Sequence, residues 1–254
     1  MKKRAFPNDI AGEAPIVWKI SMKIVYEDKD QIVIHKPAGV ATQTARLGEK
    51  DLVSEVKNHI AKESGNSNPY VAVINRLDQP VEGIVLFAKN AKAAAALTSQ
   101  MQDGSMQKFY YAVVAGHMDI SEGQLIDYMQ KDARSNVSRV VSQTAHNAKK
   151  AMLSYEVKAN LEKMQFLQIQ LLTGRHHQIR VQFSHRGHAL IGDTKYGSAE
   201  SISLGREMNA RVPALCAFCL KWKHPVTKKE LSVEIQPDNS LMRGVYNEAE
   251  NFRD

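Results

Sequence analysis

The strand-forming runs of this chain are short, and the segments between them leave little room for the helical crossovers that parallel strands need. Runs rich in valine, isoleucine, leucine and tyrosine alternate with turn-forming residues. They predict strands at residues 23–28, 31–36, 71–74, 84–88, 108–116, 166–172, 215–222 and 231–235. We expect weaker strands within residues 117–163 and an irregular, charged tail after residue 235. The pattern predicts an α+β fold, with a mostly antiparallel mixed β-sheet flanked by helices.

Helices are predicted where the apolar spacing or the composition changes to a helical type. Residues 52–63 follow Asp51, and the alanine-rich residues 91–101 follow Asn90. Aspartate and asparagine are favoured N-caps because their side-chain oxygens accept hydrogen bonds from first-turn N–H groups. A third helix is expected at residues 177–185.

The domain organisation follows from where this periodicity begins. Residues 1–20 lack it and are expected to form an N-terminal extension, whereas residues 21–254 are expected to form one domain. The chain contains no run of about 18 apolar residues that could span a membrane. Acidic residues follow the basic start, where a signal peptide would be apolar. We therefore expect a cytoplasmic protein.

The two cysteines, Cys216 and Cys219, form a Cys-x-x-Cys pair within a predicted strand. Such a pair can be half of a zinc site or a redox centre. A second ligand pair at zinc-finger spacing is missing, and residues three apart on a regular strand point to opposite faces. We expect two reduced, core or half-buried cysteines without a metal or redox role.

Two polar segments far apart in the sequence carry the candidate chemistry. Residues 75–78 (Asn-Arg-Leu-Asp) and residues 173–180 (Thr-Gly-Arg-His-His-Gln-Ile-Arg) each follow an apolar run. A lone aspartate among arginines suits a protein that binds phosphates and does its chemistry with one carboxylate. The net charge of +7 agrees with a polyanionic partner such as nucleic acid, although it also fits an ordinary basic surface.

Five short motifs follow one another along the chain. They are residues 33–40 (Val-Ile-His-Lys-Pro-Ala-Gly-Val), 76–83 (Arg-Leu-Asp-Gln-Pro-Val-Glu-Gly), 108–116 (Lys-Phe-Tyr-Tyr-Ala-Val-Val-Ala-Gly), 173–182 (Thr-Gly-Arg-His-His-Gln-Ile-Arg-Val-Gln) and 187–197 (Gly-His-Ala-Leu-Ile-Gly-Asp-Thr-Lys-Tyr-Gly). With these five motifs in this order, the chain resembles the RluA family of RNA pseudouridine synthases. The resemblance covers roughly residues 22–237 and implies that residues 21–254 are a pseudouridine synthase catalytic domain.

The resemblance implies an isomerase that converts specific uridines of rRNA or tRNA to pseudouridine. The glycosidic bond is cut, the uracil turns, and its 5-carbon is joined to the sugar, with no cofactor or metal. Matched by motif, Asp78 is the catalytic aspartate, Arg180 pairs with it, and Tyr110 packs against the uracil. The substrate-binding residues expected from the same motifs are Arg76, Arg175 and Ile179.

Elementary chemistry agrees with these roles. A uridine inside folded RNA must be flipped out before it reacts, which costs roughly a few kcal/mol. An arginine such as Arg76 offsets part of that cost because it stacks on bases and meets phosphate. The ring of Tyr110 offers about 1–3 kcal/mol of stacking. A neighbouring arginine favours the ionised form of Asp78. The sequence leaves open whether this carboxylate attacks the sugar, attacks the base or abstracts the 2′-proton.

Several positions depart from the family pattern. Asn75 stands where histidine is common, Val81 and Glu82 replace a Thr-Ser pair, and His176 replaces a threonine. Glu82 adds a negative charge four residues from Asp78 and is a candidate to alter the ionisation of that carboxyl or its contacts with RNA.

These departures leave a second interpretation open, namely an RNA-binding or RNA-remodelling protein on the same fold with weak or lost catalysis. A third interpretation, a metal-dependent nuclease, would use the histidines at 176, 177, 185 and 188, but they lack a carboxylate at ligand spacing. The first interpretation predicts a monomer that acts on structured RNA, without a membrane or metal partner.

Overall fold

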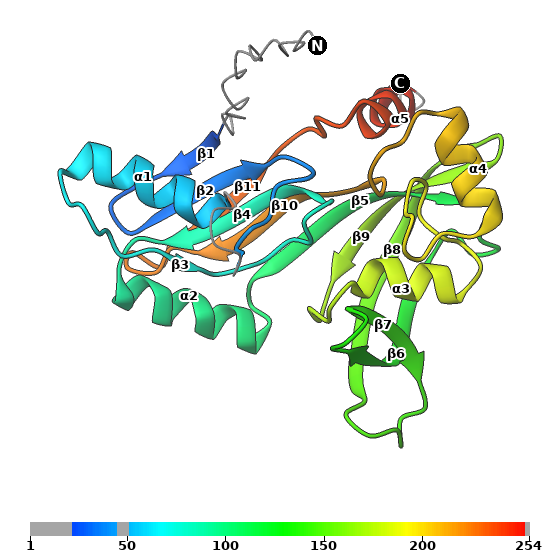
Figure 1. Ribbon diagram of the computed structural model, residues 1–254, viewed down its shortest axis with the longest axis horizontal. Coiled ribbons are helices and arrows are strands. Elements are labelled where there is room, and N and C mark those ends of the chain that lie inside the picture. Colours follow the sequence, from blue (N-terminus) through cyan, green and yellow to red (C-terminus); the bar gives the residue numbers. More distant parts are fainter. Residues whose placement is uncertain (1–21, 45–50, 252–254) are drawn as a thin grey trace, which may run out of the picture.

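The computed structural model describes residues 22–44 and 51–251, so the predicted N-terminal extension, residues 1–20, lies outside the described residues. The strands are β1 (Lys23–Glu27), β2 (Gln31–Lys36), β3 (Ala72–Val73), β4 (Glu82–Ala88), β5 (Gln107–Ala115), β6 (Glu122–Asp132), β7 (Val137–Val141), β8 (Lys149–Leu161), β9 (Met164–Leu171), β10 (Leu215–Lys223) and β11 (Glu230–Glu234). The helices are α1 (Leu52–Ser64), α2 (Ala91–Asp103), α3 (Gln178–His185), α4 (Ala199–Glu207) and α5 (Ser240–Asn251) (Figure 1).

These strands form one large sheet in the order β1-β2-β4-β10-β5-β9-β8-β6-β7. Beside this path, β11 pairs with β10 and β3 pairs with β4. Among the strands that the structure describes, only β4 and β10 run parallel. The prediction of a mostly antiparallel α+β fold is therefore confirmed.

Helices α1 and α2 begin directly after the capping residues predicted for them, Asp51 and Asn90. Asp51 Oδ1 accepts a hydrogen bond from the Ser54 N–H at 2.8 Å, and Asn90 Oδ1 accepts one from the Ala93 N–H at 2.8 Å. The third helix, α3, begins after His177, whose φ of 55° is left-handed. No helix in the described part of the chain has the length and apolar character needed to cross a membrane.

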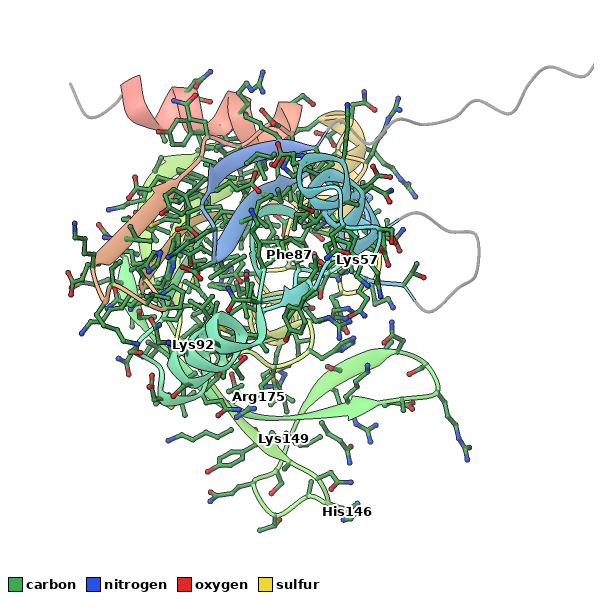
Figure 2. The ribbon with its side chains drawn as sticks, turned by 90° about the vertical axis from the view of Figure 1, so that its left-hand side faces the viewer. Lys57, Phe87, Lys92, His146, Lys149 and Arg175 are labelled. Carbon is green, nitrogen blue, oxygen red and sulfur yellow. The ribbon has the colours of Figure 1, made fainter. Side chains whose placement is uncertain are left out.

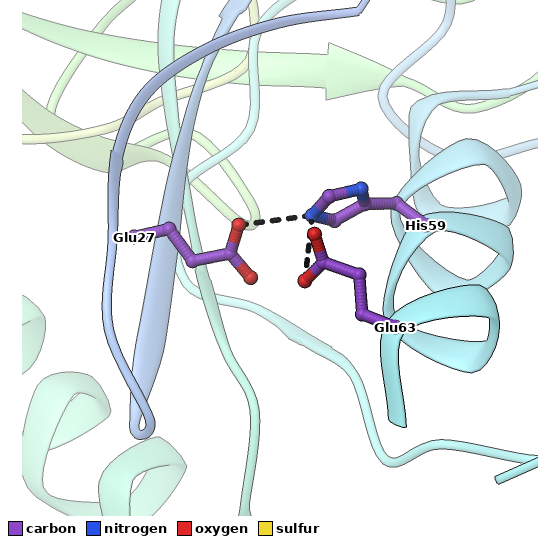
Figure 3. A group of neighbouring side chains, drawn as sticks. All are labelled: Glu27, His59 and Glu63. Carbon is purple, nitrogen blue, oxygen red and sulfur yellow. Dashed lines mark hydrogen bonds and ion pairs between the residues drawn. The ribbon is translucent and has the colours of Figure 1, made fainter. Parts of the chain in front are cut away.

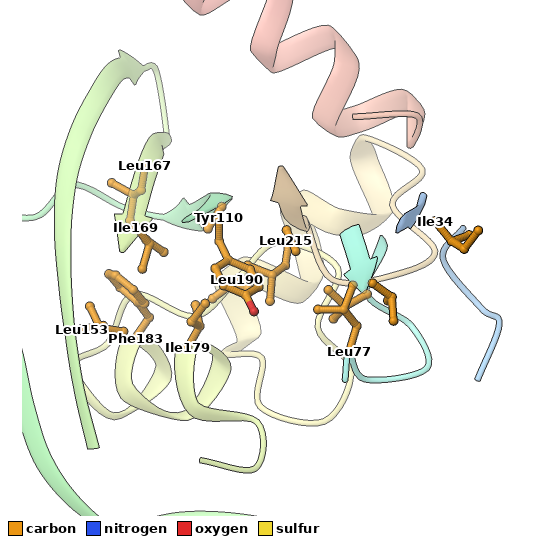
Figure 4. Packing of buried hydrophobic residues seen from close by; sticks show 14 of the residues in the cluster. Ile34, Leu77, Tyr110, Leu153, Leu167, Ile169, Ile179, Phe183, Leu190 and Leu215 are labelled. Atoms are coloured by element: carbon orange, nitrogen blue, oxygen red, sulfur yellow. The ribbon is translucent and has the colours of Figure 1, made fainter. Parts of the chain in front are cut away.

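Alternation along the strands buries apolar side chains on both faces of the sheet. In β5, Tyr110 and Ala112 belong to one core cluster, whereas Tyr111 and Val113 belong to another on the opposite face. Helices α1 and α3 pack on the first cluster, where Phe183 of α3 is fully buried (Figure 4). Helices α4 and α5 pack on the second cluster.

The expectation for the C-terminal part was wrong. The residues after β11 are not an irregular tail, because Ser240–Asn251 form α5 and pack Leu241, Met242 and Val245 against the sheet. Helix α4 was not predicted either. Both helices are short, and their apolar faces gain stability from packing on the sheet rather than from intrinsic helix propensity.

Cys216 and Cys219 are both buried and free, as expected. Their predicted divergence to opposite faces was wrong, because both belong to the same core cluster. The pairing of β10 with β5 shifts register between the two cysteines. Such an irregularity interrupts the two-residue alternation of a strand.

The middle segment forms an arm that projects from the body of the molecule (Figures 1 and 2). It consists of β6, β7 and the adjoining part of β8, where weaker strands were predicted. Its exposed basic side chains are Lys131, Arg134, Arg139, Lys149 and Lys150.

Candidate active site

Asp78 lies in the turn between β3 and β4. Its backbone carbonyl accepts a hydrogen bond from the Val81 N–H at 3.0 Å. The strand that follows approaches β10 closely at Gly83, where φ is +134° and an added Cβ would lie 2.5 Å from the backbone of Ala217. Only glycine permits this approach, which places the Asp78 turn at one end of the parallel strand pair.

The fully buried Lys36 ties this turn to the end of β2. Its Nζ donates hydrogen bonds to the carbonyl oxygens of Pro37, Val40 and Gln79 at 3.0, 2.7 and 3.1 Å. Burial lowers the pKa of Lys36 to about 7, and the charge of Asp78 opposes that shift. Since Gln79 follows Asp78 directly, Lys36 anchors the segment that carries the carboxylate.

We expect Lys36→Met to lower the free energy of unfolding by about 1–3 kcal/mol, because three hydrogen bonds from the buried Nζ to carbonyl oxygens are lost while the aliphatic stem is nearly preserved. Urea unfolding at neutral pH measures the effect. Lys62→Met, on the exposed surface of α1, is the control and should change stability by less than about 0.5 kcal/mol. Equal stability of the two variants would show that Lys36 does not anchor the turn.

Gln178 fixes the second polar segment against the sheet. Its Oε1 accepts hydrogen bonds from Thr173 Oγ1 at 2.7 Å and from the Arg175 N–H at 3.0 Å. Its Nε2 donates to the Met152 carbonyl and to Gln182 Oε1, both at 3.0 Å. With its oxygen and nitrogen both engaged, this amide orients the loop before α3, whose first turn then faces the β3–β4 turn.

Arg180 joins two carboxylates. Its Nη1 donates to Asp78 Oδ2 at 3.1 Å, and its Nε and Nη2 form a bidentate pair with Asp193 at 2.7 and 2.8 Å. The side chains of Arg180 and Asp193 are 5% and 1% exposed. Burial raises the pKa of Asp193, but the hydrogen bonds and charge of Arg180 outweigh burial and bring the pKa below its usual range.

His177 and Tyr196 surround Asp78 from another side. His177 Nε2 lies 3.6 Å from Asp78 Oδ2, and its Nδ1 lies 2.7 Å from the Tyr196 hydroxyl oxygen. The guanidinium carbon of Arg180 lies 5.1 Å from the centre of the Tyr196 ring, which is a cation–π distance. Burial lowers the pKa of His177 to about 4, although the charge of Asp78 raises it, so the imidazole is neutral at neutral pH.

Tyr110 on β5 forms an apolar wall of the site. Its side chain is 6% exposed and belongs to the same core cluster as Ile179 and Leu215 (Figure 4). Burial raises the pKa of Tyr110, and the nearby charge of Asp78 raises it further. The hydroxyl therefore stays protonated at neutral pH.

A cavity of about 300 Å³ is lined by Asp78, Tyr110, His177, Gln178 and Arg180. That volume lies at the lower end of the range of about 300–1,000 Å³ for small-molecule pockets. Arg76 and Arg175 are exposed at its rim. The cavity brings together all six residues singled out from the sequence, namely Asp78, Tyr110, Arg180, Arg76, Arg175 and Ile179.

Three further residues of the site were not predicted for it. Asp193 lies in the fifth motif, where its Oδ1 accepts two backbone N–H groups of the turn that follows and a hydrogen bond from Arg180, which it orients. His177 was considered only as a metal ligand. Lys108 lines the cavity, and burial lowers its pKa. All three residues lie within the five motifs. The motifs therefore pointed to these residues but could not show which side chains they contact.

The Asn75 departure has a structural explanation. Its Nδ2 donates to the Ile84 carbonyl at 3.0 Å, and its Oδ1 accepts from the Leu86 N–H at 2.8 Å. The buried amide therefore bonds to the backbone of β4 on both sides and holds the chain before the Asp78 turn against that strand.

Glu82 points away from the cavity. Its Oε2 accepts hydrogen bonds from the backbone N–H groups of Asp238 and Asn239 at 3.1 and 3.0 Å. Burial raises the pKa of Glu82, although these two hydrogen bonds lower it. Glu82 thus holds the segment before α5 and does not line the cavity around Asp78.

We expect Glu82→Gln to change how stability depends on pH. Because folding raises the pKa of Glu82, the folded state binds more protons than the unfolded state above the unfolded pKa of about 4.3, and stability falls as pH rises toward the raised value. Glutamine removes that contribution. Urea unfolding across this window measures it, with the exposed Glu162→Gln as the control. Identical pH profiles for wild type and Glu82→Gln would contradict the prediction.

One group of side chains outside the cavity has the spacing of metal ligands. Ligand atoms of Glu27, His59 and Glu63 lie within 4.8 Å of one another (Figure 3). His59 Nε2 lies 2.9 and 3.4 Å from the two carboxylates, and Lys89 Nζ lies 2.7 Å from Glu27. These ion pairs account for the arrangement.

A second such group contains Asp28, Asp30 and His224. His224 Nδ1 accepts hydrogen bonds from the N–H groups of Val226 and Thr227, both at 3.1 Å. The neutral ring therefore carries its proton on Nε2 and donates it to Asp28 at 3.0 Å. In this tautomer Nε2 has no lone pair for a metal ion.

The fold is that of the pseudouridine synthases. The structure of human RNA pseudouridylate synthase domain containing 4 is similar, with a TM-score of 0.71 at 19% identity, over 87% of this chain and 91% of that chain. The sequence profile described as RNA pseudouridylate synthase matches residues 30–185, which include both polar segments. The chain belongs to this family.

Named relatives confirm the resemblance drawn from the five motifs. Ribosomal large subunit pseudouridine synthase D of Vibrio cholerae is 32% identical over 220 residues, covering 84% of this chain and 66% of that protein. This chain thus spans slightly less than two thirds of the relative's length. The tRNA pseudouridine synthase C of Vibrio parahaemolyticus is 26% identical over 233 residues, covering 87% of this chain and 92% of that protein. The expected class, an RNA-modifying isomerase, is the class of this family.

Proposed function

We propose that this protein is an RNA pseudouridine synthase in which Asp78 is the catalytic residue. One observation carries the proposal. The Asp78 carboxylate lies in the cavity with its Oδ2 held by Arg180 at 3.1 Å, while the described residues offer no hydrogen bond to its Oδ1. A carboxylate held through one oxygen presents the other to a substrate.

The remaining side chains fit the steps of the reaction. The flipped uracil stacks on Tyr110, whose protonated hydroxyl can donate a hydrogen bond. Arg180, fixed by Asp193, orients the Asp78 carboxylate through its Oδ2. The bond between the sugar and N1 breaks, the uracil turns within the cavity, and C5 bonds to the sugar. C5 then releases its proton to water, and N1 takes up a proton in its place, so that the product is an isomer of the substrate. Ile179 in the cavity wall confines the detached base.

The surroundings of the cavity suit an RNA substrate. Arg76 and Arg175 are exposed at the rim, and Arg175 donates to the Lys150 carbonyl at the base of the arm (Figure 2). Exposed basic side chains along the arm can meet further phosphates. Because relatives are named for ribosomal and transfer RNA, we assign rRNA or tRNA as the substrate.

Release of tritium from RNA labelled at the uracil 5-carbon tests this function directly, since that hydrogen is lost when C5 bonds to the sugar. The RNA should come from cells that lack the gene, so that its sites are unmodified. We expect release that continues undiminished in a strong chelator. Salt-sensitive binding without release would instead favour an RNA-binding or RNA-remodelling protein.

A further inference from the structure

Tyr196 connects the arm to His177 through hydrogen bonds whose directions can be assigned. The backbone N–H of Ser138 on β7 can only donate, and it donates to the Tyr196 hydroxyl oxygen at 2.9 Å. Within the described structure, His177 Nδ1, 2.7 Å away, is the acceptor for the hydroxyl proton. An accepting Nδ1 leaves the proton of the neutral ring on Nε2, and Nε2 faces Asp78 Oδ2.

The His177 ring is held in this orientation. It stacks on His176 with 3.6 Å between ring centres, and His176 Nδ1 lies 2.9 Å from the Ser138 hydroxyl. Burial, Arg180, His176 and Lys195 all disfavour a second proton on His177, and only Asp78 favours one. The ring therefore offers a single N–H donor toward the carboxylate.

The backbone of His177 also marks it as unusual. Its φ of 55° is left-handed, a conformation that is uncommon outside glycine, although histidine, asparagine and aspartate adopt it more often than other residues. Such strain persists where surrounding structure imposes it and is concentrated at functional sites. Here it turns the ring from the start of α3 toward Asp78.

Building on the proposed role of Asp78, we infer that His177 is a positioning residue for that carboxylate and that Tyr196 sets its tautomer. Nε2–H and Arg180 then share Oδ2, which leaves Oδ1 for the substrate. The distance of 3.6 Å exceeds the usual hydrogen-bond range of about 2.7–3.2 Å. Contacts of this kind tighten when the substrate binds.

Two substitutions at His177 separate this role from a structural one. Asparagine accepts the left-handed backbone but stops short of Asp78, so His177→Asn should lower kcat about 10- to 100-fold with KM changed less than about threefold. His177→Gln restores a donor at the reach of Nε2 and should recover part of that loss. The exposed His117→Asn, after β5 and outside both the cavity and the arm, is the matched control and should behave as wild type.

Tyr196→Phe tests the connection, because it keeps the ring over Arg180 and removes only the hydroxyl. Alone it should lower kcat about 10-fold, whereas in the His177→Asn background it should lower kcat no further. Multiplicative losses in the double variant would overturn the inference.

Imidazole 15N chemical shifts give a readout that does not depend on activity. We expect the Nε2–H tautomer of His177 in the full-length protein and a mixture of tautomers in Tyr196→Phe. An Nδ1–H tautomer in the wild type would overturn the inference. Failure of the proposed function would be recognised separately, from absent tritium release by the wild type.

Discussion

Asp78→Asn should lose nearly all turnover, by about 10³-fold or more, while it keeps the fold and most of the RNA affinity. The amide matches the carboxylate in shape and can still contact Arg180, so the cavity stays formed. It cannot attack an electrophile or take a proton, whichever of these the carboxylate does. Tritium release measures turnover, and filter binding measures affinity for the same RNA.

The control for this variant is Asp103→Asn. Asp103 is an exposed carboxylate at the end of α2, where it accepts a hydrogen bond from the Ser105 N–H at 2.8 Å. It lies outside the cavity, so this variant should turn over at the wild-type rate. Substantial tritium release by a clean Asp78→Asn preparation would remove Asp78 from its proposed role.

Arg180→Ala should lower the free energy of unfolding by about 3–5 kcal/mol, the largest effect on stability that we expect. Its removal leaves Asp193 buried, with two charge-assisted hydrogen bonds lost. Arg180→Lys should not restore stability, because an ammonium group cannot reproduce the planar fork that contacts both carboxylates. Urea unfolding measures both variants.

An exposed ion pair provides the comparison for Arg180. Arg243 and Asp238 lie 2.7 Å apart, with side chains 55% and 47% exposed, and Arg243→Ala should cost less than about 1 kcal/mol.

The buried pair of Arg180 and Asp193 should also make stability depend on pH. Since folding lowers the pKa of Asp193, this pair stabilises the fold above the unfolded pKa of about 3.9 and loses this effect as pH falls through the folded value. Arg180→Ala should lack that acid-dependent loss. Unchanged stability in Arg180→Ala would show that the buried pair contributes nothing.

Local patterns predicted much of the fold because their signals lie within a few residues. The caps Asp51 and Asn90 act on N–H groups three residues away, so the sequence located both helix starts. The divergence expected of Cys216 and Cys219 failed because a register shift depends on the neighbouring strand. Helix α5 escaped prediction because its stability comes from packing on the sheet.

The amino-acid sequence by itself determined the chemical groups of the site, namely one aspartate and three arginines in the two polar segments that follow apolar runs. Only the tertiary structure decided their pairings, since Asp78 and Arg180 are 102 residues apart in the chain. It also showed that Asp193 orients Arg180 and that Glu82 faces another segment. The physical reason is that hydrogen-bond direction and burial depend on distances between segments remote in sequence, and no local pattern contains those distances.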